Sequence, residues 1–261
     1  MVDRATRYQT KKWLAKLAGR RPAAGATLLI YHRVGGGTTN ELDLSLDSFE
    51  RQIQLLTDHD VVSLDAAVDR LELGDSSPSV VLTFDDGFED VYRNAWPLLR
   101  QHRLPFTIYL ASAYVGSDMH WEGATAKGPA GRGLSWQHLD QMVASGLCTI
   151  GNHTHHHVRP ELVTAAELDA CSDAVKQHLG VGPRHFTYPW GVVVPAVEPV
   201  VHERFRTAST GHVGRNLPGA DLMTLRRVPV RRTDPEEFFA AKLRGNLVPE
   251  RIYANAVRAA K

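Results

Sequence analysis

The chain has 261 residues, of which 43% are hydrophobic and 23% are charged, a balance typical of soluble globular proteins. Its 30 Lys and Arg residues and 29 Asp and Glu residues leave a formal net charge of +1, which gives no electrostatic reason to expect a nucleic-acid partner. The first residues lack the apolar run that a signal peptide needs, and no segment is long enough to span a bilayer. We therefore expect a cytoplasmic protein that does not bind nucleic acid.

The N-terminal segment, residues 1–25, is basic and amphipathic. It combines lysines such as Lys11 and Lys12 with the apolar Trp13, a pattern that predicts a basic helix. Such a helix is either an ordinary surface helix, which we favour, or a peripheral contact with a membrane surface. No linker or repeat divides the rest of the chain, so we expect residues 26–261 to form a single domain.

From residue 26 onward, strand patterns alternate with helix patterns. Short β-branched and aromatic runs predict strands at residues 26–34, 79–84, 106–110, 149–150, 186–188, 207–209 and 228–230. Amphipathic patterns predict a helix after residue 87 and others at residues 47–58, 135–146, 161–179 and 197–206, while the Gly-rich residues 115–133 predict an inserted loop. This order indicates an α/β protein with parallel strands, whose functional side chains gather at the carboxyl ends of the strands.

The strand at residues 79–84 is followed by two adjacent carboxylates, Asp85 and Asp86, and then by Gly87. Successive strand residues point to opposite sides, so one carboxylate can bind a metal while the other reaches a water on that metal. Gly87 allows the chain to turn sharply at this point. An acidic pair at a strand end can instead cap the next helix, and this alternative stays open.

Four histidines occur within residues 153–157 (HTHHH), directly after another strand. On a helical turn, the spacing of four places His153 and His157 on one face. Two imidazoles and one carboxylate form a catalytic ligand set for a divalent metal, with positions left for water and substrate. A fortuitous polar loop is the alternative, but it becomes less attractive because the Asp pair and the His pair both follow predicted strands.

Four segments together resemble the polysaccharide deacetylase family, the NodB-type domains of carbohydrate esterase family 4. They are residues 83–87 (TFDDG), 153–157 (HTHHH) and 186–191 (FTYPWG), together with residues 31–34 (YHRV), which resemble an opening motif of the exopolysaccharide-deacetylase branch. The resemblance covers roughly residues 26–230, in the family's order. It implies a distorted (β/α)7-type barrel.

The resemblance also implies roles for individual residues. Asp85 aligns with the general base, while Asp86, His153 and His157 align with the metal ligands and the backbone N–H of Tyr188 with the oxyanion donor. The implied reaction is removal of an N-acetyl group from an amino sugar. Its chemistry is consistent with the residues, because amide hydrolysis needs an activated water, a base and charge stabilisation. The metal is expected to be Zn, with Co, Ni or Mn as alternatives.

The proton donor departs from the usual family pattern. Many members carry it as a late histidine, but no histidine follows His212 in this chain. His32, after the first strand, is the favoured candidate for the general acid, and His212 is the alternative. Either side chain can instead be structural, His32 as a packed strand-end residue and His212 as part of a surface loop.

A second departure is Thr187, where many members have an arginine that supports the catalytic base. Arg227, next to the strand at residues 228–230, is the best replacement, and Arg184 is a weaker one; both can also be solvated surface residues. Without a neighbouring cation, the pKa of the Asp85 carboxyl would not be tuned in the usual way.

Two tryptophans are candidate substrate contacts. Trp190 replaces the usual tyrosine of the third motif, and Trp121 lies in the Gly-rich insertion. An exposed indole beside the site can stack on the apolar face of a sugar ring, but either tryptophan can equally belong to the core.

Two other functions stay open. The same residues can remove a formyl or another N-acyl group, or the chain can be a metal-holding, glycan-binding relative that has lost turnover. The intact Asp85 argues against the second alternative, because a binding protein has no use for a base beside the metal. The sequence does not predict an oligomeric state.

Overall fold

The structure is a computed structural model that describes residues 3–121, 124 and 131–259. In this part of the chain, the main sheet has seven strands in the order β8-β7-β6-β5-β4-β1-β9. These strands are β1 (Ala26–Tyr31), β4 (Ser79–Asp86), β5 (Phe106–Leu110), β6 (Cys148–Asn152), β7 (His185–Thr187), β8 (Thr207–Ser209) and β9 (Arg227–Pro229). A small second sheet pairs β2 (Arg33–Val34) with β3 (Asp43–Leu44).

Every pair of neighbours in the main sheet is parallel. The sheet curls until its edges meet, because Leu225, just before β9, forms a parallel bridge with Ser209 of β8. β1 and β4 are buried along their whole length, as expected for strands covered on both faces. The result is the (β/α)7-type barrel that the family resemblance implies.

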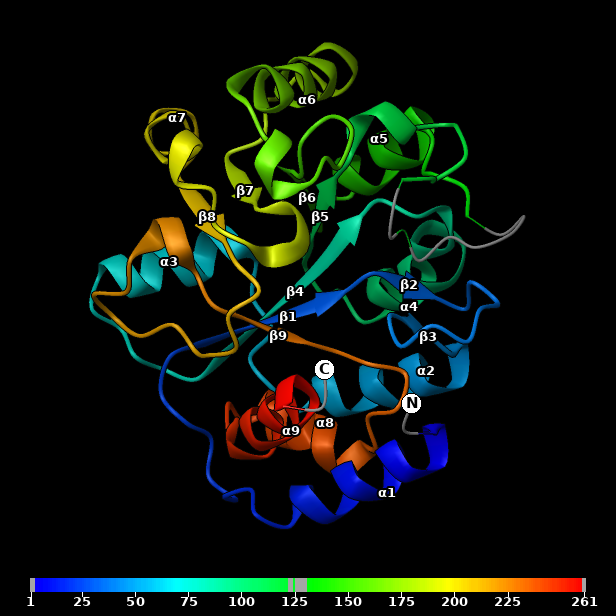
Figure 1. The fold of residues 1–261 in the computed structure, drawn as a ribbon, viewed down its shortest axis with the longest axis vertical. Coiled ribbons are helices and arrows are strands. Elements are labelled where there is room, and N and C mark those ends of the chain that lie inside the picture. Colours follow the sequence, from blue (N-terminus) through cyan, green and yellow to red (C-terminus); the bar gives the residue numbers. More distant parts are fainter. Residues whose placement is uncertain (1–2, 122–123, 125–130, 260–261) are drawn as a thin grey trace.

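Helices surround this barrel (Figure 1). They are α1 (Arg4–Ala15), α2 (Leu46–Leu56), α3 (Leu64–Glu72), α4 (Trp96–Gln101), α5 (Trp136–Ala144), α6 (Ala165–Leu179), α7 (Glu198–Arg204), α8 (Glu236–Leu243) and α9 (Val248–Ala259). A π-helical turn, Val91–Ala95, precedes α4. Among the described residues, no helix combines the length and the apolar character needed to cross a membrane.

Capping side chains set several helix starts. Ser135 caps α5, since its Oγ accepts the N–H of His138 at 3.1 Å. The helix predicted at residues 161–179 begins later, because Thr164 caps α6 through the N–H of Glu167. The helix predicted at residues 47–58 is capped by Ser45 and ends at Leu56. The predicted strand at residues 26–34 is interrupted at His32, which separates β1 from β2.

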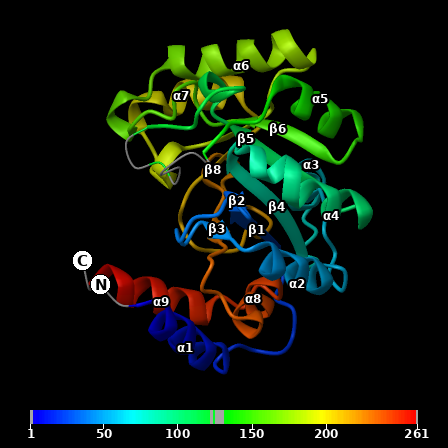
Figure 2. The same ribbon diagram turned by 90° about the vertical axis from the view of Figure 1, so that its right-hand side faces the viewer.

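The two ends of the chain meet on one side of the barrel. α1 packs against both α8 and α9, and the two views show these three helices together, on the side opposite α6 (Figures 1 and 2). Leu14 of α1 forms a small apolar cluster with Phe238 and Tyr253. The N-terminal helix is therefore joined to the last helices of the chain rather than to its neighbour in sequence.

Candidate metal centre and active site

The candidate site is a cavity of about 230 Å³ at the carboxyl ends of the barrel strands. Asp85 and Asp86 are the last residues of β4, and His153 follows β6 directly. The cavity is lined by Ile30, His32, Leu42, Asp85, Asp86, Trp121, Ala124, His153, His157, Tyr188, Trp190, Gly191, Gly211 and Arg227. The barrel thus brings together all the predicted site residues except His212 and the weaker candidate Arg184.

Asp86, His153 and His157 form a compact, buried group. Their ligand atoms all lie within 4.8 Å of one another, and Asp86 Oδ1 is 3.5 Å from His153 Nε2 and 3.4 Å from His157 Nε2. Two ligand atoms that share one ion at roughly 2.1 Å are separated by distances of this size. Asp86 Oδ1 is buried and has no hydrogen-bond partner among the described residues. The donors therefore fit a single divalent ion.

The two imidazoles are prepared for ligation in different ways. His153 Nδ1 donates to the carbonyl of Thr187 at 2.9 Å, a bond that orients the ring with its other nitrogen, Nε2, toward Asp86. Burial lowers the pKa of His157 to about 4, so this ring is neutral at physiological pH. Burial raises the pKa of Asp86, but the two imidazoles outweigh this effect and the pKa lies well below its ordinary value. Asp86 and His157 are therefore in the protonation states that bind a metal.

The turn that carries both histidines is not helical, which corrects the reason given above for their spacing. Thr154 and His157 have left-handed backbones with φ of 65° and 50°. Asn152 holds the turn, because its Oδ1 accepts the N–H of Thr154 at 2.8 Å and its Nδ2 donates to the carbonyl of Leu168 at 2.8 Å. An irregular turn, and not one face of a helix, brings the two rings to Asp86.

Asp85 is held by a buried cation. Arg227 Nη1 and Nη2 contact the two carboxylate oxygens of Asp85 at 2.7 and 2.8 Å, a bidentate geometry that guanidinium favours. The remaining Arg227 donors reach Thr83 Oγ1 and the carbonyl of Thr210, both at 3.3 Å. Burial raises the pKa of Asp85, but Arg227 and then His153 lower it more, so the pKa lies below its ordinary value. Asp85 is therefore ionised.

Arg184, the weaker candidate cation, lies elsewhere. Its Nη1 contacts Asp65 at 3.1 Å, near the amino end of β7. It has no contact with Asp85, so it is not the cation beside this carboxylate.

The two candidate acids differ in position. His32 lines the cavity and its buried Nδ1 has no partner among the described residues. It lies close enough to the carboxylates that its charge lowers the pKa of both Asp85 and Asp86. His212 is exposed and is absent from the cavity lining, although its neighbour Gly211 is part of it.

The position of Tyr188 corrects one expectation. Its backbone N–H donates to the carbonyl of Ser209 at 3.1 Å, so this group is used within the barrel and is not free to bind an oxyanion. Its ring is buried and packs on Phe186 with centroids 4.8 Å apart. The side chain thus belongs mainly to the core beneath the cavity.

Two indoles flank His157. The ring of Trp121 lies 4.5 Å and that of Trp190 5.8 Å from the His157 ring, between centroids. Trp190 is 47% exposed and has a left-handed backbone with φ of 63°. Both rings line the cavity, and neither is part of the buried core.

Several lining residues were not predicted. Ile30, Leu42 and Gly211 carry no chemical signal of their own, and nothing in their local sequence marks them as site residues. Leu42 reaches the cavity from the loop between β2 and β3. Thr187, noted only as a departure from the family, supplies the carbonyl that orients His153.

Comparison with known proteins places the site in a family. The model of the polysaccharide deacetylase family matches residues 73–203, half of the chain. The Bacillus subtilis protein YxkH is 30% identical over 126 residues, which cover 46% of this chain and 44% of YxkH. A poly-beta-1,6-N-acetyl-D-glucosamine N-deacetylase of Staphylococcus epidermidis is 24% identical over 197 residues, 64% of this chain and 65% of the relative. The chain therefore spans less than two thirds of the length of these relatives.

Solved structures agree with this assignment. IcaB from Ammonifex degensii is 29% identical and superposes with a TM-score of 0.72, over 87% of this chain and 100% of that one. The polysaccharide deacetylase BC0361 from Bacillus cereus is 23% identical, with a TM-score of 0.69 over 84% of this chain and 68% of that one, and shows the same fold. Given the matching family model, the barrel and the Asp-His-His group, this chain belongs to the polysaccharide deacetylase family.

Proposed function

We propose that this protein is a metal-dependent hydrolase that removes the N-acetyl group from an amino sugar, in a glycan, a lipid-linked saccharide or a small glycoside. One observation carries the proposal: the ionised Asp85 opens into the same cavity as the Asp86–His153–His157 group. A base beside a metal group is the equipment that amide hydrolysis requires. The names of the staphylococcal relatives, which are N-deacetylases of a poly-N-acetylglucosamine, support an N-acetyl substrate.

Asp86, His153 and His157 would hold the metal, and we propose Zn, with Co, Ni or Mn as alternatives. A bound divalent ion would polarise the acyl carbonyl and acidify an attacking water. The protein's own contribution begins with Asp85, which accepts the proton of that water. Arg227 keeps Asp85 ionised and fixes the direction of its carboxylate, so the base is in place before substrate binds.

On the other side of the scissile bond, His32 donates a proton to the leaving nitrogen. Its position in the cavity and its unpartnered Nδ1 support this role over His212. Trp121 and Trp190 present ring faces beside His157, where they contact the sugar and exclude water from the reacting group.

We also propose that residues 26–261 act as one NodB-type domain, to which residues 1–25 add a basic helical segment. A peripheral membrane contact of that segment would use its outward side chains, such as Trp13 and Leu17, which are 61% and 48% exposed. The inner side of α1 is already occupied by α8 and α9.

The test is release of acetate by the metal-loaded protein from N-acetylglucosamine oligosaccharides of increasing length. Replacing Asp85 with Asn should lower kcat by about 10²–10⁴-fold, while the metal content measured by elemental analysis stays at the wild-type level. Asp140→Asn, an equivalent change at an exposed position on α5, is the matched control and should keep full activity. Full activity of the Asp85 variant would overturn the proposed mechanism.

A substrate panel separates the remaining alternatives. N-formyl and N-acetyl versions of the same amino sugars, with detection of formate and acetate, distinguish a deformylase from a deacetylase. Binding of the oligosaccharides without any acid release would identify a glycan-binding protein that has lost turnover.

A further inference from the structure

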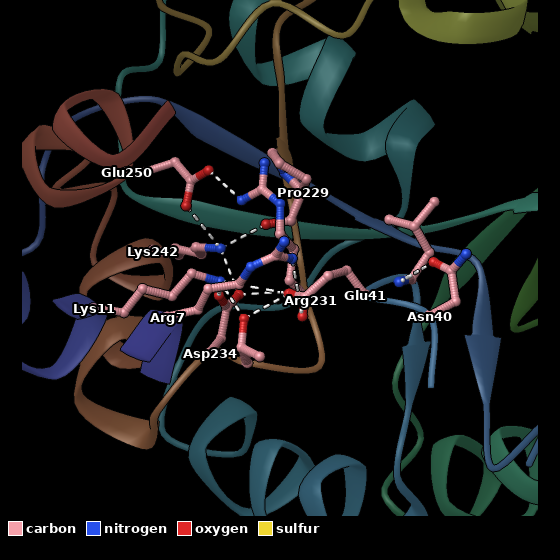
Figure 3. A network of polar contacts seen from close by, with 11 residues as sticks. Arg7, Lys11, Asn40, Glu41, Pro229, Arg231, Asp234, Lys242 and Glu250 are labelled. Carbon is pink, nitrogen blue, oxygen red and sulfur yellow. Dashed lines mark hydrogen bonds and ion pairs between the residues drawn. The ribbon is translucent and has the colours of Figure 1, made fainter. Parts of the chain in front are cut away.

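A largely buried group of charged and polar side chains joins the two ends of the chain (Figure 3). We call it the ionic cluster; it consists of Lys11, Glu41, Arg231, Thr233, Asp234, Lys242 and Glu250. At its centre, Asp234 accepts from Lys11 Nζ at 2.7 Å and from Lys242 Nζ at 2.6 Å. Lys242 also contacts Glu250 at 3.0 Å. The cluster therefore links α1 to α8 through Asp234, and α8 to α9 through Glu250.

Joining helices through such a cluster costs desolvation free energy, because the charged side chains are removed from water. The side chains of Lys11, Asp234 and Lys242 are at most 1% exposed, and apolar residues of the same size would anchor the helices at least as well. Hydrogen bonds between charged side chains are directional, so such a cluster can fix the orientation of a segment that is bonded to it.

Glu41 lies at the edge of the cluster. Its Oε2 accepts the hydroxyl of Thr233 at 2.5 Å and is 3.9 Å from Lys11 Nζ, while its Oε1 is 3.6 Å from Arg7 Nη1. Its carbonyl accepts the N–H of Arg232 at 2.7 Å. Both the side chain and the backbone of Glu41 are thus held by the terminal segments of the chain.

The next residue, Leu42, lines the active-site cavity. Its carbonyl accepts the N–H of Arg33 at 3.2 Å, and Arg33 directly follows His32, which also lines the cavity. Asp43, at the end of the loop, also holds its first half, because its carboxylate accepts the N–H groups of Gly36 at 2.9 Å and Thr38 at 2.7 Å. Residues 33–43 therefore form a hydrogen-bonded loop that directly follows His32 and has Leu42 near its end.

We propose that Glu41 is a positioning residue, through which the ionic cluster holds the loop at residues 33–43 and so places His32 and Leu42 against the cavity. The effect on turnover rests on the proposed function, since it assumes that His32 acts on the substrate. The effect on the loop does not, because it follows from the hydrogen bonds alone. The N-terminal helix, through Lys11 and Arg7, thereby becomes part of the site's support.

The experiment compares Glu41→Ala and Glu41→Gln with Val68→Ala in the full-length, metal-loaded protein. Val68 is buried in the separate apolar cluster under α3, so its variant lowers Tm without touching the loop. Hydrogen–deuterium exchange of the amides of residues 33–43 reports on the loop, and acetate release gives kcat and KM. Glu41→Gln keeps an acceptor for Thr233 and serves as the partial-rescue variant should Glu41→Ala fold poorly.

We expect faster exchange of the loop amides in Glu41→Ala, by about 10-fold or more, because local opening becomes easier. We expect kcat to fall about 10- to 100-fold with a smaller change in KM, as for a misplaced catalytic group. Glu41→Gln should show an intermediate loss, and Val68→Ala should leave loop exchange and kcat within about twofold of wild type despite its lower Tm.

Wild-type exchange of the loop in Glu41→Ala would overturn the proposal, and so would equal losses of kcat in Glu41→Ala and Val68→Ala. If the wild-type protein releases no acetate from any substrate, the proposed function fails, but the exchange data still decide whether Glu41 holds the loop.

Discussion

One guanidinium sets the charge of the candidate base. Asp85 is buried, and an isolated carboxyl in such a place would be protonated at neutral pH. Arg227 prevents this with two hydrogen bonds, at 2.7 and 2.8 Å. The sequence indicated Arg227 only as a substitute for a missing family arginine, since a residue 142 positions away from Asp85 has no local signature. The identity of the partner depends on the strand order of the sheet, which places β9 beside β1, the direct neighbour of β4.

Removing this cation should change the pH dependence of turnover. In Arg227→Gln, the pKa of Asp85 should rise, so the acidic limb of the kcat/KM profile should move to higher pH. Because an unpaired buried charge remains, the free energy of unfolding should fall by about 3–5 kcal/mol. Arg227→Lys is the matched variant; it keeps the charge but loses the bidentate contact, so its pH profile should stay near wild type at a lower kcat. An unshifted limb in Arg227→Gln would show that Arg227 does not control the base.

At the scale of single elements, helices with a clear amphipathic pattern were predicted best. The helix predicted at residues 135–146 corresponds to α5, Trp136–Ala144. The histidine turn was placed correctly in the sequence but given the wrong geometry, because a spacing of four fits a helical turn and an irregular turn equally well. α8 was not predicted, since Phe238, Phe239, Ala241, Lys242 and Leu243 are all buried and leave no amphipathic pattern to detect.

The turn that carries Trp190 gives a second prediction. Gly191 has φ of +69°, and a Cβ there would lie 2.6 Å from Gly211 Cα. Gly191→Ala should therefore displace the turn and the Trp190 indole, raise KM and lower the free energy of unfolding by about 1–3 kcal/mol. Gly211→Ala is the matched control, because its Cβ would meet Gly191 at 3.2 Å and should have a milder effect. Denaturant unfolding and substrate titration measure both quantities, and equal effects of the two changes would contradict this account.

At the scale of the whole molecule, the alternation of strands and helices was enough to predict a parallel sheet, and the family resemblance implied that the sheet forms a barrel. It was not enough to predict how the chain ends pack, because the contacts that hold them are remote in sequence. Lys11 and Asp234 are 223 positions apart, and no sequence pattern around either residue indicates that the other is its partner. The metal group was predicted for the opposite reason, since its ligands all follow strands whose carboxyl ends must meet in a barrel.

The ionic cluster should make stability depend on pH. Burial raises the pKa of Asp234, but Lys242, Lys11 and Arg231 lower it well below its ordinary value. A depressed pKa adds stability that is complete above the unfolded value of about 3.9 and is lost as the pH falls through the folded value. Tm should therefore drop steeply below about pH 4.

Asp234→Asn tests this cause. It should lower the free energy of unfolding at neutral pH by about 3–5 kcal/mol, because Lys11 and Lys242 lose their buried counter-ion. Its Tm should then vary less between pH 3 and 7, whereas Asp140→Asn should follow the wild-type curve. Parallel curves for wild type and Asp234→Asn would assign the acid sensitivity to other groups.

The left-handed residues of the site have a consequence for laboratory evolution. Asp86, Thr154, His157 and Trp190 all have positive φ, a conformation that costs a side chain about 1–3 kcal/mol and that glycine adopts freely. Libraries selected only for heat resistance should therefore accumulate glycine at Thr154 and Trp190, and the change at Trp190 should weaken substrate binding as Tm rises. At Trp190, the substitution that favours stability removes a proposed substrate contact. Thermostable variants therefore have to be screened for turnover at every round.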